Sequence, residues 1–325
     1  MEIVLEEHQI CYKVEGLFAP KEGLNLDNYL LIKRKPGRVM IFDENRRMLI
    51  PESDDDQIDQ PLISPDEAHI YFKIKGSPEK IDKLADETQE ELANILHLYV
   101  LISNNFVQRL PGRSQKSISN EDPFGSLHPT ITLPMRTALR PEQTANYYTL
   151  LENTVDFYDK YKKIFNTRSK RYLKNAIAYF YKASEDIKTG HLEMALIDLM
   201  ISLESLIGGF SELSYRHSLR AGRLVSLIEE NGFSIMYKEI YKLYGKRNKI
   251  VHGGLEVDLS RKEVNDFRKN IKNIILVLIY IDKNKEGIID LLDNCIVDYK
   301  NANEELNALV TSAKVKLHEK GILKK

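Results

Sequence analysis

The chain has only two cysteines, Cys11 and Cys295, and they lie far apart in the sequence. Structural zinc sites usually use closely spaced cysteine pairs, and disulfide-stabilised folds need several cysteines. The scarcity therefore argues against both, and it fits a reducing cytoplasm. No glycine-rich phosphate loop is present, and the aspartates at 54–56 are better explained as a solvated loop than as metal ligands. We expect no metal and no cofactor.

Long apolar runs are also missing. A transmembrane helix needs about 20 consecutive apolar residues. The strongest candidate, residues 274–281, is far shorter and is typical of a buried helix. The first seven residues are acidic, whereas a secretory signal begins with basic residues. We therefore expect a cytoplasmic protein with no membrane contact.

Charge is distributed unevenly along the 325 residues. Residues 1–167 carry 20 Lys and Arg against 27 Asp and Glu, a net charge of −7, whereas residues 168–325 carry 27 against 21, a net charge of +6. The densest basic stretch, 238–272, has ten basic and five acidic residues. A polyanion such as RNA would favour that half. Solvated helix faces explain the charge equally simply, and charge alone favours that explanation.

The first part of the chain is predicted to be rich in strands and to end in a long helix. Ser77 is suited to cap that helix and Pro78 to begin it, and the apolar spacing continues to about residue 106. Residues 109–140, with four prolines, indicate a loop or linker, and 141–165 indicate a second helix. Short apolar or alternating runs that indicate strands occur at 3–5, 10–12, 29–32, 39–42 and 70–74.

Helical periodicity replaces the strand pattern from Arg168 onward. The length and these patterns predict an α+β protein of more than one domain. We divide it into a strand-rich domain at 1–140, a connecting helix at 141–167, an all-α helical domain at 168–290 and a helical extension at 291–325. Helices separated by glycines are predicted at about 168–187, 190–207, 213–231, 234–250, 260–281 and 299–318.

One carboxylate lies among the core positions of the helix predicted at 190–207. Glu204 is surrounded by Leu199, Leu203 and Leu206 at helical spacing. A buried carboxylate needs a partner, and the arginines of 215–220 are candidates, Arg220 above all. An exposed position at the edge of the apolar stripe is an equally good interpretation.

The segment 244–254 carries the residues best suited to chemistry. Asn248 and His252 are four residues apart and share a helix face, and Arg247 is about 100° around the helix from Asn248. Arg offers a planar fork for phosphate oxygens, and His transfers protons near neutral pH. Arg and His at a helix end also complement the helix dipole, and residue types alone favour that structural explanation.

Three segments resemble one family and occur in the same order along the chain. They are Leu196–Leu206, Glu212–Ala221 and Tyr244–Gly254, and together they are similar to the ApeA-like branch of the HEPN superfamily. The resemblance covers about residues 168–282. Its hallmark, an Arg, a polar residue, three free positions and a His, corresponds here to Arg247, Asn248 and His252.

The resemblance implies a helical bundle that dimerises and forms one composite cleft from two motifs. It implies a metal-independent endoribonuclease, as found in toxins, CRISPR-associated effectors and phage-defence proteins. His252 would transfer protons, Arg247 would stabilise charge on the phosphate, and Asn248 would position one of them. Because RNA supplies its own nucleophile, positioning and electrostatics could suffice without metal.

Other residues near the motif are assigned supporting roles. Tyr241 and Tyr244 would stack on a base if exposed, although core packing is the commoner role. Glu204 and Arg220 are assigned a structural role. The candidates for RNA binding are Lys246, Lys249, Arg216, His217 and Tyr244.

Two other functions remain open. The helical domain would serve as an RNA- or protein-binding dimerisation module without turnover if its motifs were buried or faced apart. It would be a regulated subunit if a separately encoded nucleotidyltransferase controlled it. The strand-rich domain carries no motif that identifies its role, and a ligand or regulatory protein is its expected partner.

Overall fold

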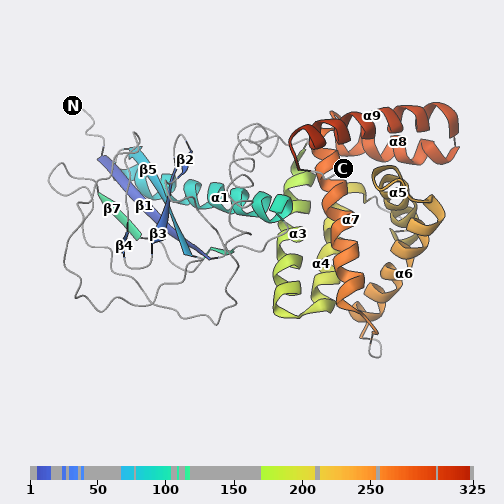
Figure 1. The fold of residues 1–325 in the computed structure, drawn as a ribbon, viewed down its shortest axis with the longest axis horizontal. Coiled ribbons are helices and arrows are strands. Elements are labelled where there is room, and N and C mark those ends of the chain that lie inside the picture. The colour runs from blue at the N-terminus through green and yellow to red at the C-terminus, as the bar shows by residue number, and fades with distance from the viewer. Residues whose placement is uncertain are drawn as a thin grey trace. The chain divides into compact units, whose positions relative to one another are not determined.

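The computed structural model describes residues 6–15, 24–26, 29–35, 38–39, 67–76, 78–103, 108–109, 114–117, 170–208, 213–253, 257–297 and 299–322. The chain forms two compact units, 1–158 and 159–325 (Figure 1). The predicted connecting helix at 141–167, the acidic loop at 52–56 and the capping residue Ser77 lie outside the described residues.

An antiparallel sheet forms the described part of the first unit. Strand β5 is central, between β1 and β3, and Glu6 of β1 lies opposite Gly76 of β5. Strand β2 extends the sheet beyond β3, β4 also pairs with β3, and β6 and β7 pair with β1. The strands are β1 (Glu6–Glu15), β2 (Leu24–Leu26), β3 (Tyr29–Lys35), β4 (Arg38–Val39), β5 (Glu67–Gly76), β6 (Gln108–Arg109) and β7 (Ser114–Ser117). Two of these strands, β6 and β7, lie in and beside the segment that the sequence indicated as a loop.

Helix α1 (Pro78–Ser103) follows β5 directly and contacts β5 and β1. Pro78 is its first residue, which suits a side chain that fixes φ and lacks an N–H. The first half of α1 is largely exposed, and the second half is buried on most sides. The buried side chains are Leu92, Ile95, Leu96, Leu98, Tyr99, Val100, Leu101 and Ile102.

The second unit is an all-α bundle, as predicted for this part of the chain (Figure 1). Helix α8 was not predicted, and it crosses the division proposed at residue 290. Helices α8 and α9 pack on each other and belong to the same compact unit as the others. The helices are α3 (Arg171–Thr189), α4 (Leu192–Ile207), α5 (Leu213–Ile228), α6 (Phe233–Val251), α7 (Arg261–Tyr280), α8 (Lys285–Val297) and α9 (Tyr299–Glu319).

Helix α7 runs through the core of the bundle. It contacts α3, α4, α5 and α9, and the side chains from Ile271 to Ile279 are all buried. The apolar run at 274–281 is therefore a buried core helix, as the sequence indicated. A Ser260–Glu263 capping box begins α7 by satisfying backbone N–H groups at its first turn.

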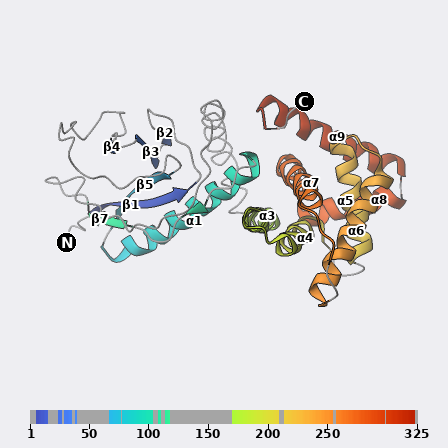
Figure 2. The same cartoon turned by 60° about the horizontal axis from the view of Figure 1, so that its bottom comes forward.

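Helices α5 and α6 lie side by side at one edge of the bundle, as Figures 1 and 2 show. Gly222 of α5 faces the backbone of Tyr237 on α6, and a Cβ atom at this glycine would lie 2.9 Å from the Tyr237 nitrogen. The absence of a side chain therefore permits the close approach of the two helices, and it fixes the position of α6.

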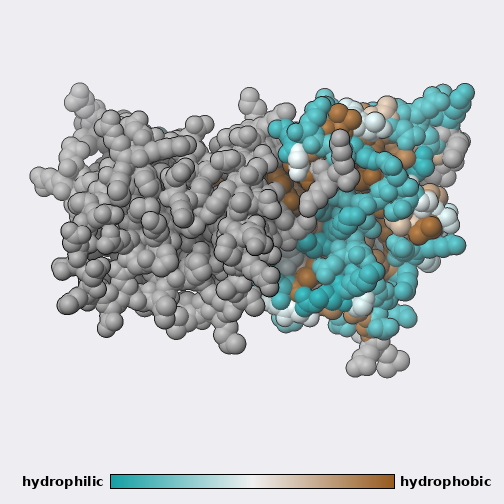
Figure 3. Space-filling model, viewed as in Figure 1, coloured by the Kyte–Doolittle hydropathy of each residue, from teal (hydrophilic) through white to brown (hydrophobic). Residues whose placement is uncertain are grey.

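The visible face of the helical unit is mainly hydrophilic, with scattered hydrophobic patches (Figure 3). Within the described residues, no helix is long and apolar enough to cross a membrane. The hydrophobic residues of the bundle are instead gathered between its helices, with few large ones exposed.

Candidate functional site

The motif residues lie at the carboxyl-terminal end of α6. The helix ends at Val251, and His252 follows as the capping residue, with its backbone N–H donating to the Asn248 carbonyl at 3.0 Å. Gly253 has a φ of 67°, a left-handed conformation that glycine adopts at little cost. The helix therefore ends just before the glycine that the sequence indicated as a helix stop. His252 lies one helical turn beyond Asn248.

Arg247 and Asn248 are linked directly. The Arg247 Nη1 donates a hydrogen bond to the Asn248 Oδ1 at 3.2 Å. Both side chains are half-buried, whereas the His252 side chain is exposed. The Arg247 Nε is buried and has no hydrogen-bond partner within the described part of the chain. One imidazole is thus open to a ligand, beside an amide whose orientation the guanidinium helps to fix.

A buried hydrogen-bonded chain lies one turn before the motif. The Tyr244 hydroxyl lies 2.7 Å from the His217 Nδ1 and donates to the Glu204 Oε1 at 3.4 Å. Burial, followed by the charge of Glu204, raises the pKa of Tyr244. The phenol therefore stays neutral. We assign the Tyr244 hydroxyl as the donor to Glu204, and the His217 Nδ1–H as the donor to the Tyr244 oxygen.

The burial of two residues in this hydrogen-bonded group corrects the prediction that they bind RNA. His217 is 1% exposed and Tyr244 is 2% exposed, so neither side chain lies at a surface where RNA could contact it. Tyr244 occupies the core-facing side of α6, and His217 faces it from α5. Their role is to hold α6 against α5 and α4, which positions the helix end that carries Asn248 and His252.

Replacing His217 with glutamine is expected to reduce the acid sensitivity of the bundle. Burial, with Arg220 and Lys285 nearby, lowers the pKa of His217 from 6.5 to about 4. The unfolded chain therefore binds a proton between these pH values that the folded chain does not. The stability from neutral burial is complete above pH 6.5 and is lost as the pH falls towards 4.

Urea unfolding at about pH 7 and about pH 4.5 measures this effect. Wild type should lose roughly 2–3 kcal/mol more than His217→Gln over this interval, because each pKa unit corresponds to about 1.4 kcal/mol. Carboxylates such as Glu263 contribute equally to both proteins. An equal loss in the two proteins would contradict the assignment of a neutral buried imidazole.

Arg220 pairs with Asp293 of α8. Its Nε and Nη2 donate to the two carboxylate oxygens at 2.7 and 2.6 Å, and its Nη1 donates to the Ile207 carbonyl at 2.9 Å. The predicted pairing of Arg220 with Glu204 is therefore wrong: the acceptors are Asp293 and the end of α4. Glu204 itself is half-buried and accepts from Tyr244.

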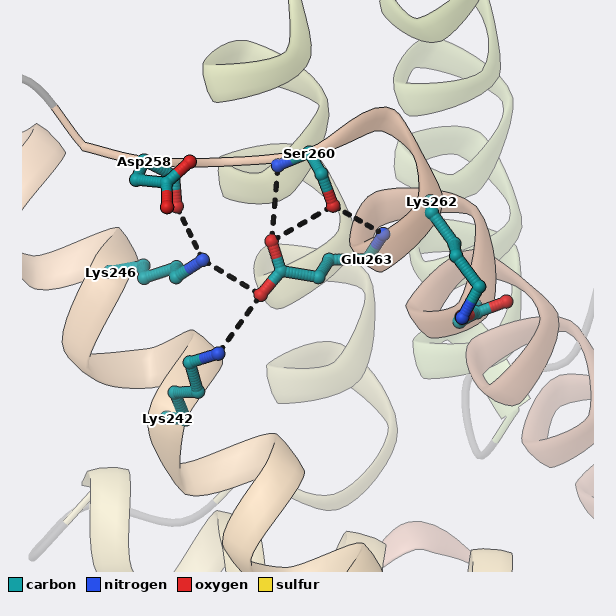
Figure 4. Close-up of polar contacts among 7 residues, drawn as sticks. Lys242, Lys246, Asp258, Ser260, Lys262 and Glu263 are labelled. Atoms are coloured by element: carbon teal, nitrogen blue, oxygen red, sulfur yellow. Dashed lines mark hydrogen bonds and ion pairs between the residues drawn. The ribbon is translucent and has the colours of Figure 1, made fainter.

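Lys246 is engaged within the chain, although it was predicted to bind RNA. Its Nζ lies 2.8 Å from the Glu263 Oε1 and donates to the Asp258 carbonyl, and Lys242 reaches the same carboxylate oxygen at 3.1 Å (Figure 4). The hydrogen bonds from Lys246 and from the Ser260 backbone lower the pKa of Glu263 to about 2. Lys246 thereby ties the end of α6 to the start of α7.

The two remaining RNA-binding candidates are exposed. Lys249 lies on the last turn of α6, and Arg216 lies on the first turns of α5. The structure thus places Arg247, Asn248 and His252 on the last turn and cap of α6, and a hydrogen bond joins the first two. It leaves Lys249 and Arg216 at the surface, and it buries His217 and Tyr244 behind the motif.

A row of aromatic rings on α6 was not recognised in the sequence, although Tyr241 was named as a residue that could stack on a base; Phe233 and Tyr241 are exposed, and Tyr237 is half-buried. Phe233, Tyr237 and Tyr241 recur every four residues, and the rings of Tyr237 and Tyr241 are stacked with centroids 5.8 Å apart. Tyr215 of α5 meets Tyr237 edge-on at 6.2 Å. The four-residue spacing was the available signal, but a tyrosine row fits a core face equally well.

Within the described residues, no group of three or more His, Cys, Asp or Glu side chains is arranged to hold a metal ion. The side chains that the motif presents at the end of α6 are an imidazole, a guanidinium and an amide. Comparison of the chain with protein-family models, with curated proteins and with solved structures found no match.

Proposed function

We propose that the helical unit is a metal-independent endoribonuclease of HEPN type. The observation that carries the proposal is the exposed His252 one helical turn from Asn248, whose amide oxygen accepts a hydrogen bond from Arg247. The resemblance of three ordered segments to the ApeA-like HEPN branch supports the same assignment. Together they supply a proton-transfer group, a positioning group and a cation over a short span of chain.

The proposed reaction uses the nucleophile within RNA. His252 accepts the proton of a ribose 2′-hydroxyl, and the 2′-oxygen then forms a bond to the adjacent phosphorus. The bond from phosphorus to the 5′-oxygen breaks, and that oxygen takes up a proton as it leaves. Arg247 stabilises the negative charge that develops on the phosphate oxygens, and Asn248 positions the guanidinium or the ribose hydroxyl. The products are a 2′,3′-cyclic phosphate and a 5′-hydroxyl.

A homodimer would supply two copies of the motif to one cleft, and the second His252 would then protonate the leaving oxygen. The proposed setting is cytoplasmic phage defence or toxin-like control of growth, because the resemblance is to proteins with these roles. In that setting the strand-rich unit would bind a ligand or a regulatory protein that restrains or triggers cleavage.

The substrate provides a direct test. Wild-type protein in EDTA should cut a single-stranded RNA and leave 2′,3′-cyclic phosphate ends. An oligonucleotide of the same sequence with 2′-deoxy sugars at every position should remain intact, because it has no nucleophile. Cleavage of the deoxy oligonucleotide, or products with 5′-phosphate ends, would contradict the proposed reaction.

A non-catalytic RNA- or protein-binding module is the second candidate. The partial burial of Arg247 and Asn248 favours it, because a motif that is withdrawn from the surface suits binding or dimerisation without turnover. In that case RNA would bind and remain uncut in EDTA and in Mg²⁺. The substrate test therefore separates the two functions.

A further inference from the structure

Most of the aromatic row is exposed although its members are large and apolar, and only Tyr237 at its centre is half-buried. Phe233 is 38% exposed and Tyr241 is 49% exposed, and Tyr215 on the neighbouring helix is 52% exposed. The rings also contact one another, with Phe233 and Tyr237 6.3 Å apart and Tyr237 and Tyr241 5.8 Å apart. The result is a preformed aromatic surface on α6 and α5, which we call the aromatic row (Phe233, Tyr237, Tyr241 and Tyr215).

The aromatic row points along the helix towards the motif. Successive residues of a helix are about 100° apart around its axis. On this spacing one arc of roughly 80° on α6 contains Tyr237, Tyr241, Gly245, Asn248 and His252. The rise of about 1.5 Å per residue places His252 roughly 22 Å from Tyr237 along the axis. A ligand lying on the rings would therefore reach the exposed imidazole without crossing to another face.

Basic side chains accompany the aromatic row. Helix α6 carries five Lys and Arg and a single acidic residue, Glu239. Lys242 and Lys246 form ion pairs with Glu263. Lys238 and Lys249 are exposed on the flank beside the row. The helix thus combines flat apolar rings with positive charge, the combination that single-stranded nucleic acids require.

Gly245 is an independent indication that something approaches this face. It lies in the interior of α6, where glycine costs about 1 kcal/mol relative to alanine. Apart from its chain neighbours and the nearby backbone of α6 itself, no atom of the described chain lies within 4 Å of the place where its Cβ would be, and the residue is exposed. Packing within the protein therefore does not require a glycine here, in contrast to Gly222. A ligand backbone or base that lies close to the helix between Tyr241 and Asn248 would require it.

We propose that the aromatic row and Gly245 form a track that binds single-stranded nucleic acid by base stacking and leads it to His252. This proposal rests on the proposed ribonuclease function and defines its substrate as unpaired RNA. Bases in a duplex are stacked on each other and cannot lie flat on the rings, so duplex RNA would not occupy the track. Stacking tolerates every base, so the track selects for strandedness and not for sequence.

Binding of a fluorescent single-stranded 2′-deoxy oligonucleotide, followed by anisotropy, tests the track without cleavage. Wild type should bind it, and Tyr241→Ala should bind about tenfold more weakly, because each stacked base contributes on this scale. Tyr241→Phe should bind within about twofold of wild type, since the ring is kept. The matched control is Tyr179→Ala on α3, at a tyrosine that is 36% exposed, and it should leave binding unchanged.

Gly245→Ala is a second test, in which stability and oligonucleotide affinity are expected to change in opposite directions. Alanine favours the helix, so the melting temperature should rise by about 2 °C, while oligonucleotide affinity falls severalfold. A stability gain with an affinity loss cannot result from misfolding. Unchanged affinity in both Tyr241→Ala and Gly245→Ala would overturn the track.

Two other results would also overturn the proposal. One is a blunt-ended duplex of the same length that competes as well as the single strand. The other is a dimer in sedimentation that Tyr241→Ala dissociates while affinity for the oligonucleotide stays the same, since the rings would then bind a second copy of the chain. The ribonuclease proposal fails separately, when RNA binds to the track and is not cut.

Discussion

Replacing Arg247 with alanine is expected to lower the rate of RNA cleavage by roughly 100- to 1,000-fold. Removal of one group that stabilises charge in a transition state typically has an effect of this size. Arg247 is the cation next to Asn248 on the motif turn, and its guanidinium offers two parallel donors to phosphate oxygens. Initial rates on a labelled single-stranded RNA in EDTA measure the change.

Two further variants sharpen this result. Arg247→Lys keeps the positive charge and loses the planar fork, so its rate should lie between those of wild type and the alanine variant. Arg171→Ala removes an exposed arginine from the start of α3 and should cleave like wild type. A rate for Arg247→Ala within twofold of wild type would contradict the proposal that Arg247 stabilises charge on the phosphate.

The second large effect concerns stability. Asp293→Ala is expected to lower the free energy of unfolding by about 3 kcal/mol, because it leaves a charged group buried without its partner. The Arg220 side chain is 3% exposed, and two of its three hydrogen-bonding nitrogens donate to Asp293. Urea unfolding at neutral pH measures the loss.

The control for this variant lies on the same helix. Asp290 of α8 is exposed, and Asp290→Ala should change stability by less than about 0.5 kcal/mol. Removing both charges together, as in Arg220→Met with Asp293→Leu, should cost less than Asp293→Ala alone, because no buried charge is left unpaired. Equal losses at Asp290 and Asp293 would show that the buried pair is not responsible.

The helices of the bundle could be predicted because local signals define them. Glycine marks the end of α3 at Gly190, where φ is 91°, and the end of α6 at Gly253. Such positions depend on backbone conformation and need no knowledge of the partner helix. Helix α8 was missed because it follows the buried end of α7 closely, although Asn284 accepts a hydrogen bond from the Gly287 N–H and offers a local signal at its start.

The partners of side chains could not be predicted in the same way. Arg220 and Asp293 are 73 residues apart, and no local pattern connects them. Tyr244 and Tyr241 are both tyrosines on one helix, yet Tyr244 is buried and Tyr241 is exposed, since the face that meets α5 and α4 is set by tertiary packing. The motif itself was identifiable because its spacing, Arg247, Asn248 and His252, lies within one helix end.

The central claim is that His252 transfers protons during RNA cleavage, and comparison of wild type with His252→Ala tests it most directly. Both proteins, with His191→Ala as a control at an exposed histidine beside α4, are incubated with single-stranded RNA in EDTA. The account predicts that wild type and the control cleave at equal rates and that His252→Ala is slower by about 100-fold or more. Equal cleavage by wild type and a folded His252→Ala variant would contradict it.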